Sequence, residues 1–223
     1  MVKTRYLVGG GVLALAVAAI ALTAAYSAEG IPSFPPTAAA TSAPLVENSD
    51  QVGFAVIGDS ITAWVGKEEG SWTSHVGADG ILFSGNGWAR NGAPLALMDD
   101  NTPRLGEDVL VILAGTNDLR STVPFGDRLG IIDSIVRKAG VADVVISAIP
   151  PFDPKPSLAT EWNAALETYA ADAGHAFVDP WVELRTRGGS YLADATLDGV
   201  HPTPDAAEQA AGPMRAAIIA AGS

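Results

Sequence analysis

From residue 51 onward, short apolar runs alternate with longer segments that have helical periodicity or a high alanine content. Uninterrupted apolar runs are typical of strands that are buried on both faces of a parallel sheet. The predicted strands cover residues 52–57, 109–113, 144–149 and 176–178, with a weaker fifth near 81–83. The predicted helices cover residues 61–65, 126–139, 158–173 and 204–221. This alternation predicts one α/β domain in which five parallel strands form the middle layer of an α/β/α sandwich.

The first residues differ from the rest of the chain. Lys3 and Arg5 precede residues 6–28, which carry no charge and are rich in Ala, Leu, Val and Gly. Ala25 and Ser27 supply the small residues that a signal peptidase requires, which predicts a signal peptide over residues 1–27. The apolar run is also long enough to remain as a membrane anchor. With either outcome we expect an exported protein, secreted or held on the outer face of the cytoplasmic membrane.

Residues 28–50 are dominated by Pro, Ala, Ser and Thr. This composition cannot bury a core, and its prolines favour extended backbone. We therefore expect a linker between the N-terminal segment and a folded domain over residues 51–223.

Charge and composition exclude several classes of function. The net charge of −12 repels a phosphate backbone, so we expect no nucleic-acid partner. The chain has no cysteine, and its three histidines, His75, His175 and His201, are far apart in sequence, so neither a thiolate nor a histidine-rich metal site is expected. No glycine-rich phosphate loop follows a strand, so no cofactor is expected.

Polar groups stand where several predicted strands end. Asp59 and Ser60 follow the first strand, Gly92 follows the weak strand, "GTND" (115–118) follows the strand at 109–113, and "DGVHP" (198–202) precedes the last helix. Loops at the carboxyl edge of such a sheet converge on one crevice. We therefore expect these groups to form a single site.

These residue types suit acyl transfer. Ser60 at a strand-to-helix turn exposes a hydroxyl, His201 can act as its base, and Asp198 can hold the other ring nitrogen. The N–H groups of Ser60 and Gly92 and the amide of Asn117 can stabilise an oxyanion. His75 has no carboxylate at this spacing, and His175 follows Gly174 at the start of the last predicted strand, so we expect structural roles for both.

The order G-D-S, a glycine block, G-T-N-D and D-x-x-H resembles the SGNH hydrolases, also called GDSL esterases and lipases. The resemblance implies the three-layer, flavodoxin-like α/β/α fold of that family and a catalytic domain over residues 51–223. It also implies that Ser60 is the nucleophile, that Asp198 and His201 complete a catalytic triad, and that Gly92 and Asn117 complete the oxyanion hole.

The match departs from the family pattern in two places. Ile61 stands where the first block usually has Leu, which is a small change at an apolar position. In the second block, Asn86 and Asn91 do not fall in the usual register with Gly92.

Three functions agree with these residues. The first is a serine esterase or lipase that cleaves carboxylic esters through an acyl-enzyme, and the second is an O-deacetylase of polysaccharides or cell walls. The third is a non-catalytic exported binding module, in which Ser60 is only a helix cap and Asp59 and Asp198 are only turn residues. The expected substrates are small-molecule, lipid or acetylated carbohydrate esters, and residues 6–28 are a potential membrane tether.

Overall fold

The computed structural model describes residues 51–63, 71–77 and 79–223. The predicted signal peptide or anchor, the predicted linker and the end of the first predicted helix lie outside these residues. Within the described ranges, no helix has both the length and the apolar character that crossing a bilayer requires.

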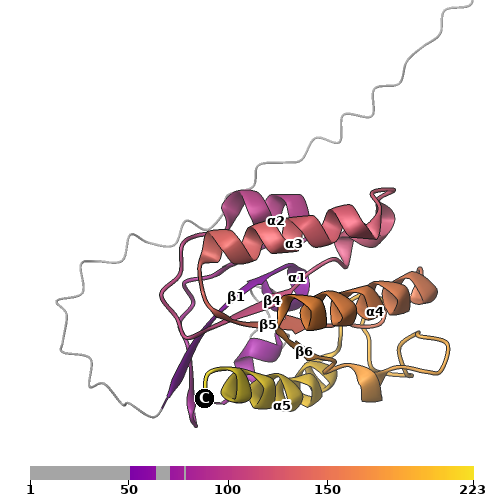
Figure 1. The fold of residues 1–223 in the computed structure, drawn as a ribbon. Helices are drawn as coiled ribbons and strands as arrows, with labels where there is room; N and C mark the ends of the chain where they lie inside the picture. Colours follow the sequence, from indigo (N-terminus) through magenta and orange to yellow (C-terminus); the bar gives the residue numbers. More distant parts are fainter. Residues whose placement is uncertain (1–50, 64–70, 78) are drawn as a thin grey trace, which may run out of the picture. The chain divides into compact units, whose positions relative to one another are not determined.

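A parallel sheet forms the centre of the fold, as predicted (Figure 1). Its strand order is β2-β1-β4-β5-β6, and all of the pairings are parallel. The strands are β1 (Val52–Gly58), β2 (Ile81–Phe83), β4 (Val109–Leu113), β5 (Asp143–Ser147) and β6 (Ala176–Val178). All five residues of β4 are buried, in agreement with the uninterrupted apolar run that predicted this strand.

A sixth strand, β3 (Trp88–Ala89), was not predicted. It pairs with β1 and, together with β2, forms one interrupted edge of the sheet. Phe54 pairs with Phe83 and Ile57 with Trp88, so residues 84–87 lie opposite only two residues of β1. A strand of two residues shows no sequence periodicity, which is why the pattern could not predict it.

Helices cover both faces of the sheet. The helical elements are α1 (Ser60–Ala63), η1 (Trp72–Ser74), α2 (Leu95–Asn101), η2 (Asn117–Arg120), α3 (Phe125–Ala139), α4 (Pro156–Ala173), η3 (Val182–Leu184) and α5 (Pro204–Ala221). Helix α3 packs against α2 and α4, and α5 packs on the sheet together with η1. Figure 1 shows α2 and α3 on the side of the strands opposite to α5. The predicted α/β/α layering is therefore confirmed.

Local chemistry explains where the helices begin and end. Gly140 and Gly174 end α3 and α4 in the left-handed region, with φ values of 69° and 74°. Thr203 accepts a hydrogen bond from the Ala206 N–H at the start of α5. Helix α2 was not predicted, because its seven residues span only two turns.

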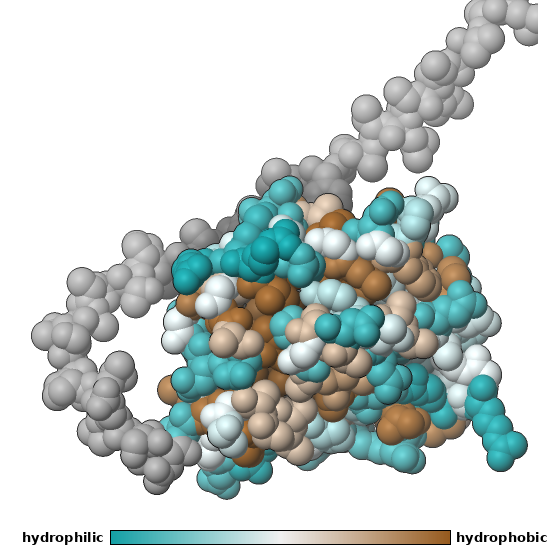
Figure 2. Space-filling model, viewed as in Figure 1, coloured by the Kyte–Doolittle hydropathy of each residue, from teal (hydrophilic) through white to brown (hydrophobic). Residues whose placement is uncertain are grey.

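Polar residues cover much of the face shown in Figure 2, with apolar residues visible between them.

Candidate active site

A continuous chain of hydrogen bonds joins Ser60, His201 and Asp198. The Ser60 Oγ lies 2.9 Å from His201 Nε2, and His201 Nδ1 lies 2.9 Å from Asp198 Oδ2. Ser60 and His201 are 141 residues apart in sequence, so tertiary folding alone creates the first of these contacts. The structure therefore brings together the three residues that the sequence indicated as nucleophile, base and acid.

Ser60 stands at a tight turn between β1 and α1. A β-carbon on Gly58 would lie 2.7 Å from the Thr62 hydroxyl oxygen, so the turn has no room for a side chain there. The Asp59 Oδ1, not the Ser60 hydroxyl, accepts a hydrogen bond from the Ile61 N–H, at 3.0 Å. The Ser60 side chain is thus free of a capping role and faces the imidazole, although the residue is only 8% exposed.

The Asp198–His201 turn orients the imidazole. Asp198 Oδ1 accepts hydrogen bonds from the backbone N–H groups of His201 and Val200, at 2.8 and 3.0 Å. Gly199 has a φ of 80°, a conformation that glycine adopts readily and that the tight turn requires. Burial opposes the ionisation of Asp198, but the hydrogen bonds from His201 and Val200 outweigh it and lower the pKa of this carboxyl. Asp198 is therefore held as a carboxylate beside Nδ1.

The three expected oxyanion donors come from neighbouring loops. Asn117 Nδ2 donates to the Ala93 carbonyl oxygen at 3.1 Å and to Asp59 Oδ2 at 3.4 Å. Asp59 is the residue before Ser60, and Ala93 is the residue after Gly92. The Asn117 amide therefore contacts a chain neighbour of each of the other two expected donors. Within the described part of the chain, the N–H groups of Ser60 and Gly92 donate to no acceptor. These two groups are therefore available to an oxyanion.

The Asp59 side chain contacts Asn117 as well as Ile61, and the sequence did not indicate the contact with Asn117. The side chain of Asp59 is fully buried and receives hydrogen bonds from both Ile61 and Asn117. Burial raises the pKa of Asp59 to about 7, the nearby Asp118 carboxylate acts in the same direction, and the Ile61 hydrogen bond opposes the shift. Asp59 is thus a turn residue, as one interpretation held, and it also contacts a candidate oxyanion donor.

Buried contacts support the loop that carries Asn117. Gly115 has a φ of 114°, and a β-carbon there would collide with the Trp162 indole. The Trp162 Nε1 donates to the Ala114 carbonyl oxygen at 3.1 Å. Asp118 Oδ2 accepts a hydrogen bond from the Leu95 N–H at 3.0 Å, which ties this loop to the start of α2.

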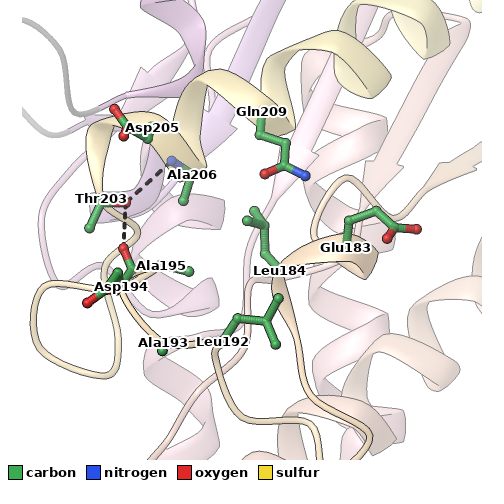
Figure 3. Close-up of a pocket in the computed structure, with 10 residues that line it drawn as sticks. All are labelled: Glu183, Leu184, Leu192, Ala193, Asp194, Ala195, Thr203, Asp205, Ala206 and Gln209. Atoms are coloured by element: carbon green, nitrogen blue, oxygen red, sulfur yellow. Dashed lines mark hydrogen bonds between the residues drawn. The ribbon is translucent and has the colours of Figure 1, made fainter.

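A cavity of about 240 Å³ lies beside the start of α5 (Figure 3). Leu184, Leu192 and Gln209 are among its lining residues, and neither Ser60 nor His201 is. The cavity is therefore separate from the serine and the histidine, although it borders the segment that leads to Asp198.

The two remaining histidines lie elsewhere, as expected. His75 ends η1, and His175 packs against Tyr169 at the end of α4. In residues 51–63, 71–77 and 79–223, no group of three or more His, Asp or Glu side chains could hold a metal ion.

The chain matches one family model over a range that contains all four sequence blocks. The model of the GDSL-like Lipase/Acylhydrolase family matches residues 56–209. A GDSL-like lipase from Bacteroides thetaiotaomicron VPI-5482 is 20% identical, with a TM-score of 0.59 over 74% of this chain and 87% of that one. The comparison with curated proteins gave no match.

Two esterases share the fold at similar distance. A carbohydrate acetylesterase from Sinorhizobium meliloti is 18% identical, with a TM-score of 0.55 over 76% of this chain and 99% of that one. The aryl esterase of M. smegmatis is also 18% identical, with a TM-score of 0.56 and the same coverage.

Proposed function

Since the chain belongs to the GDSL-like lipase/acylhydrolase family, we propose that it is an exported serine esterase that cleaves carboxylic esters through an acyl-enzyme. The observation that carries the proposal is the 2.9 Å contact between Ser60 Oγ and His201 Nε2, continued at 2.9 Å from Nδ1 to Asp198. An aligned hydroxyl, imidazole and carboxylate are what nucleophilic catalysis by serine requires.

In the acylation step, Ser60 Oγ attacks the carbonyl carbon of the ester while His201 Nε2 takes the hydroxyl proton. The carbonyl oxygen becomes an oxyanion, which the N–H groups of Ser60 and Gly92 and the Asn117 amide stabilise. The tetrahedral intermediate then collapses, the bond to the alcohol oxygen breaks, and His201 returns the proton to the leaving alcohol. A water molecule then attacks the carbonyl carbon of the acyl-enzyme while His201 takes its proton. The bond to Ser60 Oγ breaks, His201 returns the proton to Ser60, and the carboxylic acid is released.

Asp198 makes His201 competent as a base. Its carboxylate faces Nδ1, so the ring proton of neutral imidazole stays on that nitrogen and the Nε2 lone pair accepts from the Ser60 hydroxyl. The imidazolium that forms during attack gains a negative charge beside it. Asp198 therefore orients the base and stabilises its charged form.

The test is a comparison of the purified protein with Ser60→Ala. A fluorophosphonate probe should label the wild-type protein at Ser60 and leave the variant unlabelled, because only an activated serine reacts quickly. Hydrolysis of p-nitrophenyl acetate should fall at least a thousandfold in the variant. Hydrolysis by Ser60→Ala at the wild-type rate would overturn the proposal.

A carbohydrate or cell-wall O-deacetylase is the second candidate. It is favoured by the structural likeness to the carbohydrate acetylesterase of Sinorhizobium meliloti. The kcat/KM values for acetylated xylo-oligosaccharides and acetylated peptidoglycan should be compared with those for p-nitrophenyl esters. The acyl chains of these esters have about two to twelve carbons, a range set by the assay. A kcat/KM that is highest for an acetylated sugar would favour the deacetylase.

The same probe tests the non-catalytic alternative. A binding module that retained the fold would need no activated serine, so the wild-type protein would remain unlabelled.

Export can be tested separately by fractionating expressing cells and measuring the intact mass of the mature chain. Loss of residues 1–27 would indicate a cleaved signal peptide, whereas a full-length chain in the membrane fraction would indicate an anchor.

A further inference from the structure

Two hydrogen bonds tie the loop that carries Asp198 and His201 to other segments. The Asp153 N–H donates to the Gly199 carbonyl oxygen at 2.9 Å, and the Tyr191 hydroxyl donates to the Val200 carbonyl oxygen at 3.1 Å. Gly199 and Val200 are the two residues between Asp198 and His201. The donors come from the loop after β5 and from the segment after η3, so separate parts of the chain hold this turn.

The two donors are also joined to each other. The Tyr191 N–H donates to Asp153 Oδ1 at 2.8 Å. Asp153 lies directly against the turn, since a β-carbon on Gly199 would be 3.1 Å from the Asp153 β-carbon. We call Asp153 and Tyr191, with the hydrogen bond between them, the Asp153–Tyr191 clamp.

Hydrogen bonds inside the loop set its shape but not its distance from Ser60. Thr196 Oγ1 accepts from the Gly199 N–H at 2.9 Å and donates to the His201 carbonyl oxygen at 2.8 Å. These bonds, like those of the Asp198 carboxylate, act within residues 196–201. A loop with this local geometry could still move as a unit relative to α1, so its position needs contacts from outside.

The Tyr191 hydroxyl is suited to hold the loop at any pH used in an assay. The residue is only 6% exposed. Burial raises the pKa of Tyr191, and the negative charges of Asp153, Asp198 and Asp59 act in the same direction. The hydroxyl therefore remains protonated and continues to donate to Val200.

We propose that Tyr191 and Asp153 are positioning residues that hold the His201 ring within hydrogen-bond distance of Ser60. The inference rests on the proposed roles of Ser60 and His201. The clamp acts on the carbonyl groups of the turn and not on the Asp198 carboxylate. Its loss should therefore weaken the contact between His201 and Ser60 and leave the contact between His201 and Asp198 intact.

The variant Tyr191→Phe removes only the donor to Val200. We expect kcat for p-nitrophenyl acetate to fall about tenfold, the effect of one lost hydrogen bond on alignment, with KM unchanged. The rate of Ser60 labelling by a fluorophosphonate should fall by the same factor.

Asp153 offers a rescue test. Asp153→Asn keeps an oxygen that can accept from the Tyr191 N–H, so its kcat should be close to wild type, whereas Asp153→Ala should resemble Tyr191→Phe. Tyr169→Phe is the matched control for loss of a tyrosine hydroxyl. The Tyr169 hydroxyl is buried on α4 and forms no hydrogen bond with any described residue, so kcat should not change.

Folded Tyr191→Phe and Asp153→Ala proteins with wild-type kcat and labelling rates would overturn the inference. A loss of activity in Tyr191→Phe that lies in KM and not in kcat would also overturn it, because that would place the effect on substrate binding. Circular dichroism shows which variants are folded, and if Tyr191→Phe does not fold, the Asp153→Asn and Asp153→Ala pair decides. A wild-type protein that the probe fails to label would overturn the proposed function itself, and the clamp with it.

Discussion

The Asn117 side-chain nitrogen lies 3.4 Å from Asp59 Oδ2, which joins the loop after β1 to the loop after β4. The same nitrogen lies closer, at 3.1 Å, to the Ala93 carbonyl oxygen. An amide nitrogen has two hydrogens, so the longer and weaker contact to Asp59 is the one that an oxyanion would displace. The geometry of Asn117 thus leads directly to a test of its role.

Asn117→Ala should lower kcat by about a hundredfold to a thousandfold with little change in KM, since one oxyanion donor contributes mainly to the transition state. Steady-state kinetics on a p-nitrophenyl ester measures both constants. Asn163→Ala is the control, because the Asn163 side chain is buried and bonds both the N–H and the carbonyl of Ile149. The control should lose thermal stability and keep its kcat, and an equal loss of kcat in both variants would contradict the assignment of Asn117.

Asp198→Asn should reduce kcat/KM by about a thousandfold or more, because the amide no longer fixes the tautomer of His201. Steady-state kinetics on a p-nitrophenyl ester measures the loss.

Asp205→Asn is the control for Asp198→Asn, since Asp205 is an acidic residue of the first turn of α5. We expect its kcat/KM to equal that of the wild type. A wild-type kcat/KM in Asp198→Asn would contradict the proposed pairing of Asp198 with His201.

Asp59 should make folding stability depend on pH between about 4 and 7. Burial raises the pKa of this carboxyl from 3.8 to about 7, so the folded protein holds a proton that the unfolded chain has released. The contribution of Asp59 is therefore fully present below pH 3.8 and is lost as the pH rises through 7. The free energy of unfolding should fall over this range by up to about 1.4 kcal/mol per pH unit.

Urea unfolding at pH 5, 6, 7 and 8, values set by the experiment, measures this slope. Asp59→Asn should flatten it, because an amide does not titrate. The residual slope sums the other groups whose pKa burial shifts, among them Asp118, whose pKa it raises, and His175, whose pKa it lowers. A slope that is the same in the variant and the wild type would rule out Asp59 as its source.

Gly115→Ala should destabilise the protein by at least about 2 kcal/mol, since φ is 114° and the new β-carbon would collide with Trp162. Gly130→Ala is the matched control. Gly130 lies within α3, and a β-carbon there would meet no neighbouring side chain within 4 Å, so the alanine should stabilise the helix by about 0.5–1 kcal/mol. Urea denaturation gives both values, and similar effects of the two substitutions would refute the packing argument.

Local sequence patterns were sufficient for most of the sheet and for the longer helices. The apolar runs predicted β1, β4, β5 and β6 because buried strands of a parallel sheet have no polar face. The elements β3 and α2 were missed because two and seven residues are too few to show a period. The polar residues of the site were also recognisable, since they interrupt apolar segments at strand ends.

Only the tertiary structure decided which of these polar groups meet. No sequence pattern indicates the hydrogen bond from Asn117 to Asp59 or the one from Tyr191 to Val200. The reason is physical: periodicity records which face of an element is buried, whereas a hydrogen bond between distant residues depends on how whole elements pack. The sequence by itself therefore indicated Ser60, Asp198 and His201 as candidates, and the packing of β1 beside the loop before α5 placed the serine against the imidazole.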